Sequence, residues 1–475
     1  MSKTILLVLV MAFIALNTHA QTKIIKEVDG EISSQMKIIR QDNTLVGYLT
    51  FTRLEKVTED SFNYKITIMD ENLNDIGTLN FREINLQLHD VSFTNDVLCL
   101  GYYKSNFDGN IYKRQKDFDA AVATMQNEVL MQFVSLDGKI LKTTSINADV
   151  TPRIGEKGQF DRRGPSSALL EHKILLQNIE QKGFALFYGD KNNCHLLLFN
   201  TKGDILWHKK INKPQGLWFS MLSSGRDIYL LLKSTYGEGG YELLGYSTKD
   251  STAEMYYTLV DEHANQLKVL AFENDPATGQ PYVAGLVMNP KRQLEYTGLY
   301  TINVNGVDNK AIDAKYTYWN QGALDSTTDT REFEKQIKDT KINFAFKDFN
   351  GLTYFTGANH FNGAELIKQN SKATLTIETN VLDEKIRVYR PGPGAPKFGD
   401  DFYRVINTEK KADYLVADTD PVITIYDVTG KKIVHSIPHK DAGIITNVAP
   451  AKEGYIMIAE YNKKGKYTKF SIEAL

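Results

Sequence analysis

The segment "LLLFNTKGDILWHKKI" (residues 196–211) decides the fold, because it has the pattern of two β-strands joined by a tight turn. An apolar run comes first, a short polar turn with Gly203 follows, and a second run carries Trp207. Glycine readily adopts the positive φ that tight hairpins require and that other residues resist. We therefore interpret the segment as a β-hairpin and expect the chain to repeat it.

The same pattern occurs eight times along the chain. One copy is the segment quoted above, and the other seven begin at Tyr64, Val129, Tyr241, Tyr296, Thr374, Val422 and Tyr455. The flanking runs alternate in polarity, as in Ile423 and Ile425, which is the period of a strand with one face on a core. The turns follow one another at a mean spacing of about 56 residues, which fits four-stranded propeller blades with long loops.

Further β patterns between these hairpins predict the inner strands of each blade. They begin at Asp90, Leu217, Pro281 and Ala412. Each blade would then consist of an inner pair, a loop and one of the hairpins as the outer pair. Residues 117–129 and 326–339 are rich in helix formers and predict helical insertions in loops, whereas the Pro/Gly-rich residues 390–401 predict an irregular loop.

Residues 412–433, "ADYLVADTDPVITIYDVTGKKI", carry the best match to a known pattern. Together with the repeats, they make the chain resemble the secreted propeller-like proteins of uncharacterised function from Bacteroidota-type bacteria, over roughly residues 31–475. The resemblance implies an all-β fold, a β-propeller of seven or eight four-stranded antiparallel blades with short helical insertions in loops. We expect residues 23–28 to pair with C-terminal strands, which would close the ring and remove exposed sheet edges.

The C-terminal tail supports a second organisation. Residues 423–434 and 453–472 also resemble the C-terminal sorting domain of the type IX secretion pathway, a small β-sandwich. That family usually opens with a Pro-Asn-Pro-like segment, and here only Asp420 and Pro421 precede the tail strands. Two organisations therefore stay open: one propeller over residues 21–475, or a six-bladed propeller over 31–390 followed by a sandwich over 402–475.

Residues 1–20 have the pattern of a secretory signal peptide. Lys3 precedes an apolar run over residues 5–16, and small side chains lead to a predicted cleavage between Ala20 and Gln21. The run is shorter than the ~20 residues that cross a bilayer as a helix. We therefore expect a secreted or periplasmic chain with no membrane span after cleavage.

Composition excludes some classes of function and leaves others open. The formal net charge is −2, which gives no support to nucleic-acid binding, since that function usually requires a basic surface. Cys99 and Cys194 both lie in apolar runs, so we expect buried free thiols, with a disulfide as the alternative.

Motif searches predict no catalytic residue, no metal ligand and no cofactor. The chain has no Gly-x-Ser-x-Gly elbow, no phosphate-binding Gly-Lys-Ser/Thr loop and no His-Glu-x-x-His pair. Cys194 and His195 are adjacent in a predicted strand, so their side chains point to opposite faces and cannot share one metal ion. Tyr316, Tyr318 and Trp319 are the candidate binding residues, because clustered rings can form a platform for a sugar or peptide; alternatively, they seal the groove between two blades.

These observations favour a monomeric secreted or periplasmic binding or scaffold protein. Loops on one propeller face would hold a protein or glycan partner. One alternative is a glycan-processing lyase or hydrolase with its site in the central channel, and another is a structural component of the envelope. Two or more carboxylates in the channel would favour the enzyme, and a channel filled with apolar side chains would argue against it.

Overall fold

A computed structural model describes residues 21–475, except for positions 43, 59, 108–113, 150–173, 181, 191–192, 213–216, 235–239, 250–253, 309–311, 319–339, 360–362, 370–374, 383–403, 419–421 and 440–442. Its strands form eight antiparallel four-stranded sheets. Within the described ranges, one helix interrupts them, α2 (Gln115–Ala123), between β7 and β8.

The sheets follow one another in chain order, and we number them accordingly. Sheet 1 contains β2 (Ser33–Gln41), β3 (Thr44–Lys56), β4 (Ser61–Asp70) and β5 (Asp75–Ile84), and sheet 2 contains β6 (Leu86–Thr94), β7 (Val97–Ser105), β8 (Asn127–Ser135) and β9 (Ile140–Asn147). Sheet 3 contains β10 (Leu175–Ile179), β11 (Gly183–Gly189), β12 (Cys194–Phe199) and β13 (Ile205–Ile211), and sheet 4 contains β14 (Leu217–Ser224), β15 (Asp227–Ser234), β16 (Tyr241–Ser247) and β17 (Glu254–Leu259). Sheet 5 contains β18 (Leu267–Asn274), β19 (Pro281–Asn289), β20 (Arg292–Val304) and β21 (Ile312–Tyr318), and sheet 6 contains β22 (Thr340–Lys347), β23 (Thr353–Asn359), β24 (Gly363–Gln369) and β25 (Leu375–Leu382). Sheet 7 contains β26 (Arg404–Asn407), β27 (Ala412–Asp418), β28 (Val422–Asp427) and β29 (Lys432–Pro438), and sheet 8 contains β30 (Ile444–Pro450), β31 (Tyr455–Asn462), β32 (Tyr467–Ala474) and the N-terminal β1 (Gln21–Lys26).

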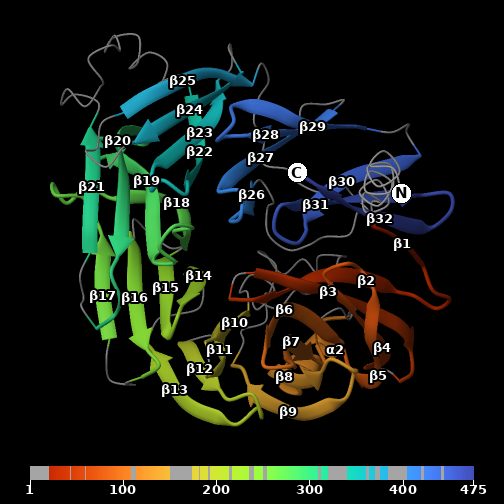
Figure 1. Cartoon of the computed structure of the whole chain (residues 1–475). Coiled ribbons are helices and arrows are strands. Elements are labelled where there is room, and N and C mark those ends of the chain that lie inside the picture. The colour runs from red at the N-terminus through yellow and green to blue at the C-terminus, as the bar shows by residue number, and fades with distance from the viewer. Residues whose placement is uncertain are drawn as a thin grey trace, which may run out of the picture.

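The eight sheets form a ring around a central axis, as Figure 1 shows; the innermost strand is the first in chain order in sheets 1 to 7 and β30 in sheet 8. Inner strands of consecutive sheets contact one another, for example β2 with β6, β6 with β10 and β10 with β14. The fold is therefore the predicted β-propeller, and of the seven or eight blades expected it has eight. Both parts of the C-terminal tail belong to this ring, as sheets 7 and 8.

The N-terminal strand closes the ring. β1 pairs antiparallel with β32 as the outermost strand of sheet 8, with Gln21 opposite Ile472 and Lys26 opposite Tyr467. The predicted pairing of an N-terminal strand with C-terminal strands is confirmed, two residues earlier than expected. Because β1 takes the outer position, the hairpin that begins at Tyr455 forms the middle of its sheet rather than the outer pair.

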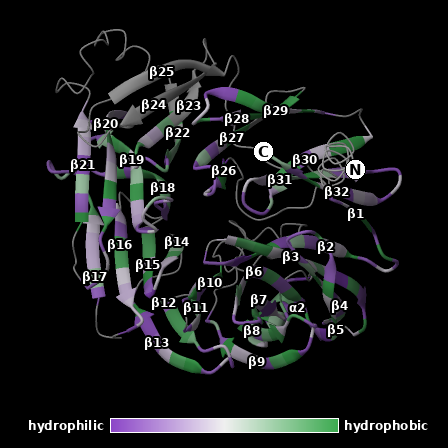
Figure 2. Ribbon diagram, viewed as in Figure 1, coloured by the Kyte–Doolittle hydropathy of each residue, from purple (hydrophilic) through white to green (hydrophobic). Residues whose placement is uncertain are grey.

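The core lies between neighbouring sheets, and this explains the two kinds of strand in the sequence. Every residue of β11 and β12 is buried, because these strands have a neighbouring sheet against each face. The outer strand β13 has the burial pattern of alternate exposed and half-buried residues. Figure 2 shows the same gradient, with hydrophobic residues concentrated on strands such as β11 and β15. A sheet of this kind cannot bury its apolar faces alone, so the ring is the unit of stability.

Turns of the outer hairpins dock on the preceding sheet. Gly138 has φ +87°, and a β-carbon at that position would lie 2.4 Å from the Thr78 carbonyl oxygen of sheet 1. Gly203 has φ +80° and lies against the ring of Phe133 in sheet 2. These glycines are therefore required twice, for the turn and for the close approach between sheets.

Two expectations need correction in detail. Of the hairpin predicted from Thr374 onward, residues 375–382 form one strand, β25, which is the outer strand of sheet 6 and pairs with the preceding β24; the second half of the predicted hairpin lies outside the described residues. The helix predicted over 117–129 is shorter and earlier, since α2 ends at Ala123 and β8 begins at Asn127. The predicted helix over 326–339 and loop over 390–401 lie outside the described residues.

Cys99 and Cys194 are both buried and unbridged, as expected. Cys99 faces the core between sheets 2 and 3, and Cys194 the core between sheets 3 and 4. Burial raises the pKa of the Cys99 thiol well above its usual value. Within the described residues, no helix has the length and apolar character needed to cross a bilayer.

Candidate functional site

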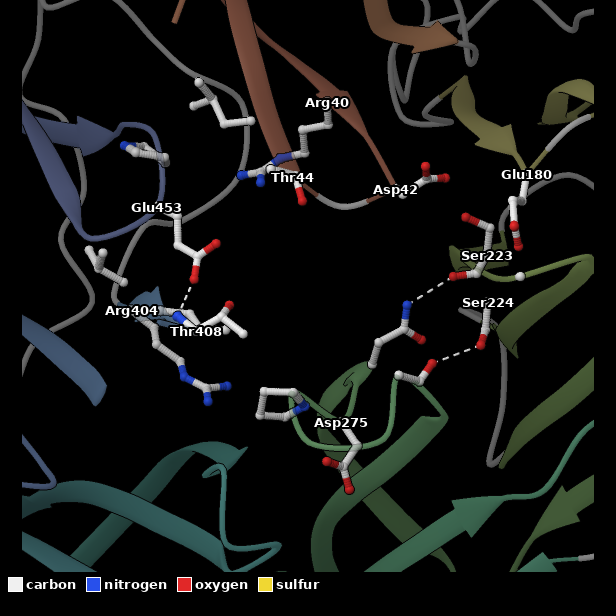
Figure 3. A pocket seen from close by; sticks show the side chains of 18 of the residues that line it. Arg40, Asp42, Thr44, Glu180, Ser223, Ser224, Asp275, Arg404, Thr408 and Glu453 are labelled. Atoms are coloured by element: carbon white, nitrogen blue, oxygen red, sulfur yellow. Dashed lines mark hydrogen bonds between the residues drawn. The ribbon is translucent and has the colours of Figure 1, made fainter. Parts of the chain in front are cut away.

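A cavity of about 620 Å³ lies at one end of the channel, where the inner strands turn back into the second strands of their sheets. Six of the eight sheets contribute to its lining. The polar members are Arg40, Asp42, Thr44, Glu180, Ser223, Ser224, Asn274, Asp275, Arg404, Thr408 and Glu453. Figure 3 shows the labelled side chains around an open centre, with Arg40 and Asp42 across from Arg404 and Asp275. The lining is therefore polar, and residues far apart in the sequence meet there.

Side-chain hydrogen bonds hold the turns of different sheets together around this cavity. Asp42 in the β2–β3 turn accepts a bond from Asn178 Nδ2 of β10 at 2.6 Å, and its own backbone N–H donates to Asn178 Oδ1 at 3.0 Å. This pair joins sheets 1 and 3, which are not neighbours in the ring. The backbone of Asp42 has φ +48°, a conformation that Asp adopts more readily than most residues.

Comparable links continue around the opening. Ser224 Oγ donates to the Gly279 carbonyl oxygen at 2.8 Å, and Asn274 Nδ2 donates to the Ser223 carbonyl oxygen at 2.9 Å, which joins sheets 4 and 5. Glu453, in the β30–β31 turn, accepts a bond from the Thr408 backbone N–H and joins sheets 7 and 8. Because these bonds use both side chains and backbone, the cavity is preorganised in the free protein.

A buried ion pair forms one wall of the cavity. Arg404 donates to Asp413 Oδ1 from Nε at 2.8 Å and from Nη2 at 2.5 Å, and Nη1 lies 3.4 Å from Glu273 Oε2. The Arg404 side chain is 6% exposed and that of Asp413 is fully buried. Burial lowers the pKa of Arg404, but the Asp413 and Glu273 carboxylates raise it above its usual value. The guanidinium therefore stays charged and joins sheet 7 to sheet 5.

A second buried pair lies beside the first. Lys347 Nζ of sheet 6 is 2.9 Å from Asp275 Oδ2 of sheet 5, with side chains 6% and 8% exposed. The same ammonium lies over the Tyr282 ring, 5.0 Å from its centroid. Arg404 also donates to the Lys347 carbonyl oxygen, so the two pairs form one network. This network fixes the position of Asp275 in the lining.

The charges that remain at the surface of the cavity are mostly negative. Arg404 and Asp275 are each balanced by a buried partner. Asp42, Glu180 and Glu453 are exposed lining residues, and Arg40 is the exposed cation among the described lining residues. The cavity therefore favours a ligand with positive charge and hydrogen-bond donors.

The predicted aromatic residues lie away from this cavity. Tyr316 and Tyr318 are on β21, the outer strand of sheet 5. The Tyr316 hydroxyl donates to the Val260 carbonyl oxygen at 3.0 Å, and the Tyr318 hydroxyl donates to Asp261 Oδ2 at 2.9 Å. Tyr318 is 6% exposed, and both rings pack with the hydrophobic cluster between sheets 4 and 5. This arrangement agrees with the alternative that the rings seal the groove between two blades. Trp319 lies outside the described residues.

The other predicted positions lie elsewhere. Of the predicted cleavage pair, Ala20 lies outside the described residues, and Gln21 is the first residue of β1. His195 points to the face of sheet 3 opposite from Cys194, and its ring bonds to Asp190 and to His208. In the part of the chain that the structure describes, no three His, Cys, Asp or Glu side chains are grouped to hold a metal ion.

The cavity residues were not predicted from the sequence. Asp42, Glu180 and Glu453 occupy ordinary polar turns, each separated from the next by more than a hundred residues. What these residues share is their position, because each follows the innermost strand of its sheet, which is β2, β10 or β30. Turns after innermost strands converge on the axis of a propeller.

Sequence comparisons identify no relative of known function. Residues 1–136, under a third of the chain, match a family model described as a family of unknown function, DUF6770. No curated protein matches the sequence.

The chain is distantly similar to several solved structures. The dihydro-haem d1 dehydrogenase NirN in complex with DHE is 12% identical, with 86% of this chain and 73% of that chain covered and a TM-score of 0.39. The β-propeller domain of the trilobed protease from Pyrococcus furiosus is 10% identical, with 86% and 98% covered and a TM-score of 0.37. Apo AztD from Citrobacter koseri is 11% identical, with 90% and 96% covered and a TM-score of 0.38. The chain is thus a β-propeller whose own topology establishes the fold, and its first 136 residues are similar to a family of unknown function.

Proposed function

We propose that this protein is a secreted or periplasmic binding protein that holds a positively charged segment of a protein partner in the channel cavity. The observation that carries the proposal is the polar cavity at the end of the channel, lined by six sheets and joined by cross-sheet hydrogen bonds. Its volume of about 620 Å³ is in the range of ligand sites in proteins.

The lining favours a peptide over a sugar. Asp42, Glu180 and Glu453 offer carboxylates to lysine or arginine side chains, and the Ser223–Ser224 turn adds hydrogen-bonding groups. Bonds between such charges are stronger than those between neutral groups. No aromatic ring occurs among the described lining residues, whereas sugar sites commonly use ring faces.

Fluorescence polarisation with labelled hexapeptides tests the proposal. We expect lysine- and arginine-containing peptides to bind more tightly than acidic ones, and binding to weaken with salt. Glu180→Gln combined with Glu453→Gln should weaken the basic peptides about 10-fold or more, because each lost charge removes a charge-assisted bond. Glu262→Gln, an exposed carboxylate in the β17–β18 connection, is the control and should have no effect. Equal binding of acidic and basic peptides, or a double variant that binds normally, would contradict the proposal.

The carboxylates also favour a second candidate, a glycan-processing hydrolase. Asp42, Glu180, Asp275 and Glu453 come from four different sheets and face one cavity, and glycoside hydrolysis commonly uses a pair of such groups. Release of reducing ends from a panel of polysaccharides, lost in both Glu180→Gln and Glu453→Gln, would support it. Absence of release by the folded wild-type protein would leave the binding protein as the function.

A further inference from the structure

Outside the channel, a chain of three side chains connects a buried carboxylate to the surface of sheet 3. His195 Nε2 lies 2.8 Å from Asp190 Oδ2, and His195 Nδ1 lies 2.9 Å from His208 Nε2. The side chains of His195 and Asp190 are 11% and 12% exposed, whereas His208 is exposed. We propose that His195 and His208 bind a divalent transition-metal ion, with Asp190 orienting His195, and that the site prefers Cu²⁺.

The backbone brings the two rings to one face. His195 is on β12 and pairs across the ladder with Lys210, while His208 on β13 pairs with Leu197. His195 and His208 are therefore diagonal neighbours, which long side chains on one sheet face can bridge. The Tyr188 ring stacks on His195 with centroids 4.8 Å apart and the planes 11° from parallel, and so fixes the ring orientation.

The hydrogen bond of Asp190 determines which His195 nitrogen faces His208. Asp190 Oδ1 accepts the Asn193 backbone N–H at 2.8 Å, so the carboxylate is held in its turn. Nε2 of His195 then donates to Oδ2, and Nδ1 is left as a lone-pair donor directed at His208. A carboxylate on the outer nitrogen of an imidazole is the usual support of metal-binding histidines, because it fixes the tautomer and makes the ligand more basic.

The distance between the two nitrogens fits a shared metal ion. Imidazole nitrogens bind such ions at about 2.0–2.1 Å, and two of them at right angles are then about 3.0 Å apart. The observed 2.9 Å is close to this value, and the exposed His208 ring would turn so that both lone pairs meet at the ion in place of the hydrogen bond between the rings. Among divalent ions at nitrogen sites, Cu²⁺ binds most tightly and accepts right-angled ligands, with water completing its coordination.

The charges near the pair are compatible with this occupant. His208 and Lys210 both lie on β13, so Lys210 is the positive charge near the pair. Asp190 supplies the negative charge on the other side of His195. Exposure of His208 gives the ion a path from solvent.

Titration of the metal-free full chain with CuCl₂, followed by calorimetry and by electron paramagnetic resonance, tests the proposal. We expect one equivalent of Cu²⁺ with the nitrogen hyperfine pattern of two imidazoles. His208→Ala should remove this equivalent or weaken it at least 10-fold. Asp190→Asn should keep the stoichiometry and weaken binding about 10- to 100-fold, as expected for an orienting carboxylate.

His435→Ala is the matched control, because His435 is on the outer strand of sheet 7 and pairs with Glu473 at 3.0 Å. It should leave the tight equivalent unchanged. Because His208→Ala also removes the hydrogen bond to the buried His195, the melting temperature of the metal-free variant is measured as well, and a cooperative transition shows that it is folded and that only a ligand has been lost. Equal Cu²⁺ binding by wild type and His208→Ala would overturn the proposal and leave the two rings as a hydrogen-bonded pair. Peptide binding by the channel cavity is independent of either result.

Discussion

Removing Arg404 should destabilise the propeller more than any exposed ion pair could. Arg404→Met leaves Asp413 as a fully buried carboxylate that has lost both hydrogen bonds to Oδ1, while its Oδ2 has no hydrogen-bond partner in the described structure. Breaking a buried ion pair from one side typically costs 3–5 kcal/mol. We expect a loss of about 4 kcal/mol of unfolding free energy, a large part of the ~5–15 kcal/mol typical of folded proteins.

The double variant Arg404→Met with Asp413→Leu tests the cause. It removes both charges, so it should recover at least about half of the loss, because an apolar pair of similar volume avoids the buried charge. Lys139→Met is the control, since Lys139 and Asp137 form an exposed pair with side chains 78% and 57% exposed, and it should leave the midpoint unchanged. Urea unfolding followed by tryptophan fluorescence and circular dichroism gives the free energies, provided both probes report one transition. A loss below about 1 kcal/mol for the single variant, or additive losses in the double variant, would refute the reasoning.

Three further outcomes are expected. His89 has a buried Nε2 with no hydrogen-bond partner among the described residues, and burial and Lys37 lower its pKa to about 4. Because the unfolded state takes up the proton first, stability should fall by roughly 3 kcal/mol between pH 6.5 and pH 4, and His89→Gln should reduce this fall in acid-dependent urea curves. Gly138→Ala should lower the free energy of unfolding by about 2 kcal/mol or more. Gly351→Ala, at φ +72° with open space for a β-carbon, should lower it less, because only the backbone conformation is strained. Equal urea midpoints for the two variants would argue against the docked turn. Trp207 is half-buried against the cluster between sheets 3 and 4, so Trp207→Ala should cost about 2 kcal/mol, less than a fully buried ring. Trp207→Phe should stay within about 1 kcal/mol of wild type, because the buried indole N–H has no partner among the described residues, and thermal melting separates the two.

Much of the fold was predictable because its signals are local. Alternating polarity around Ile423 and a glycine at Gly203 report on one hairpin each, and repetition of such hairpins indicated a ring. The prediction took residues 375–382 as the first strand of an outer hairpin, whereas they are the second strand of the outer pair of sheet 6. The order of strands in sheet 6 depends on the pairing of β25 with β24, and the sequence of β25 alone does not indicate that pairing.

The candidate site was less predictable. Clustered rings in the sequence made Tyr316 and Tyr318 candidate binding residues, but the rings pack between sheets 4 and 5. The sequence did not indicate Asp42, Glu180 and Glu453 as site residues, because single acidic residues in turns are common. Their meeting in one cavity depends on the number of sheets and on closure by β1, which are properties of the whole ring.

By itself, the sequence determined that the chain forms β-hairpins with apolar faces and glycine in many of their turns. The alternation of polarity and the turn residues act between positions that are close in the chain. It also determined that both cysteines lie in apolar strands. Only the tertiary structure decided that eight sheets close the ring, that the turns of six of them enclose a polar cavity, and that His195 and His208 meet. Those outcomes depend on packing between sheets and on strand register, which are set by contacts across the entire molecule rather than by any one segment.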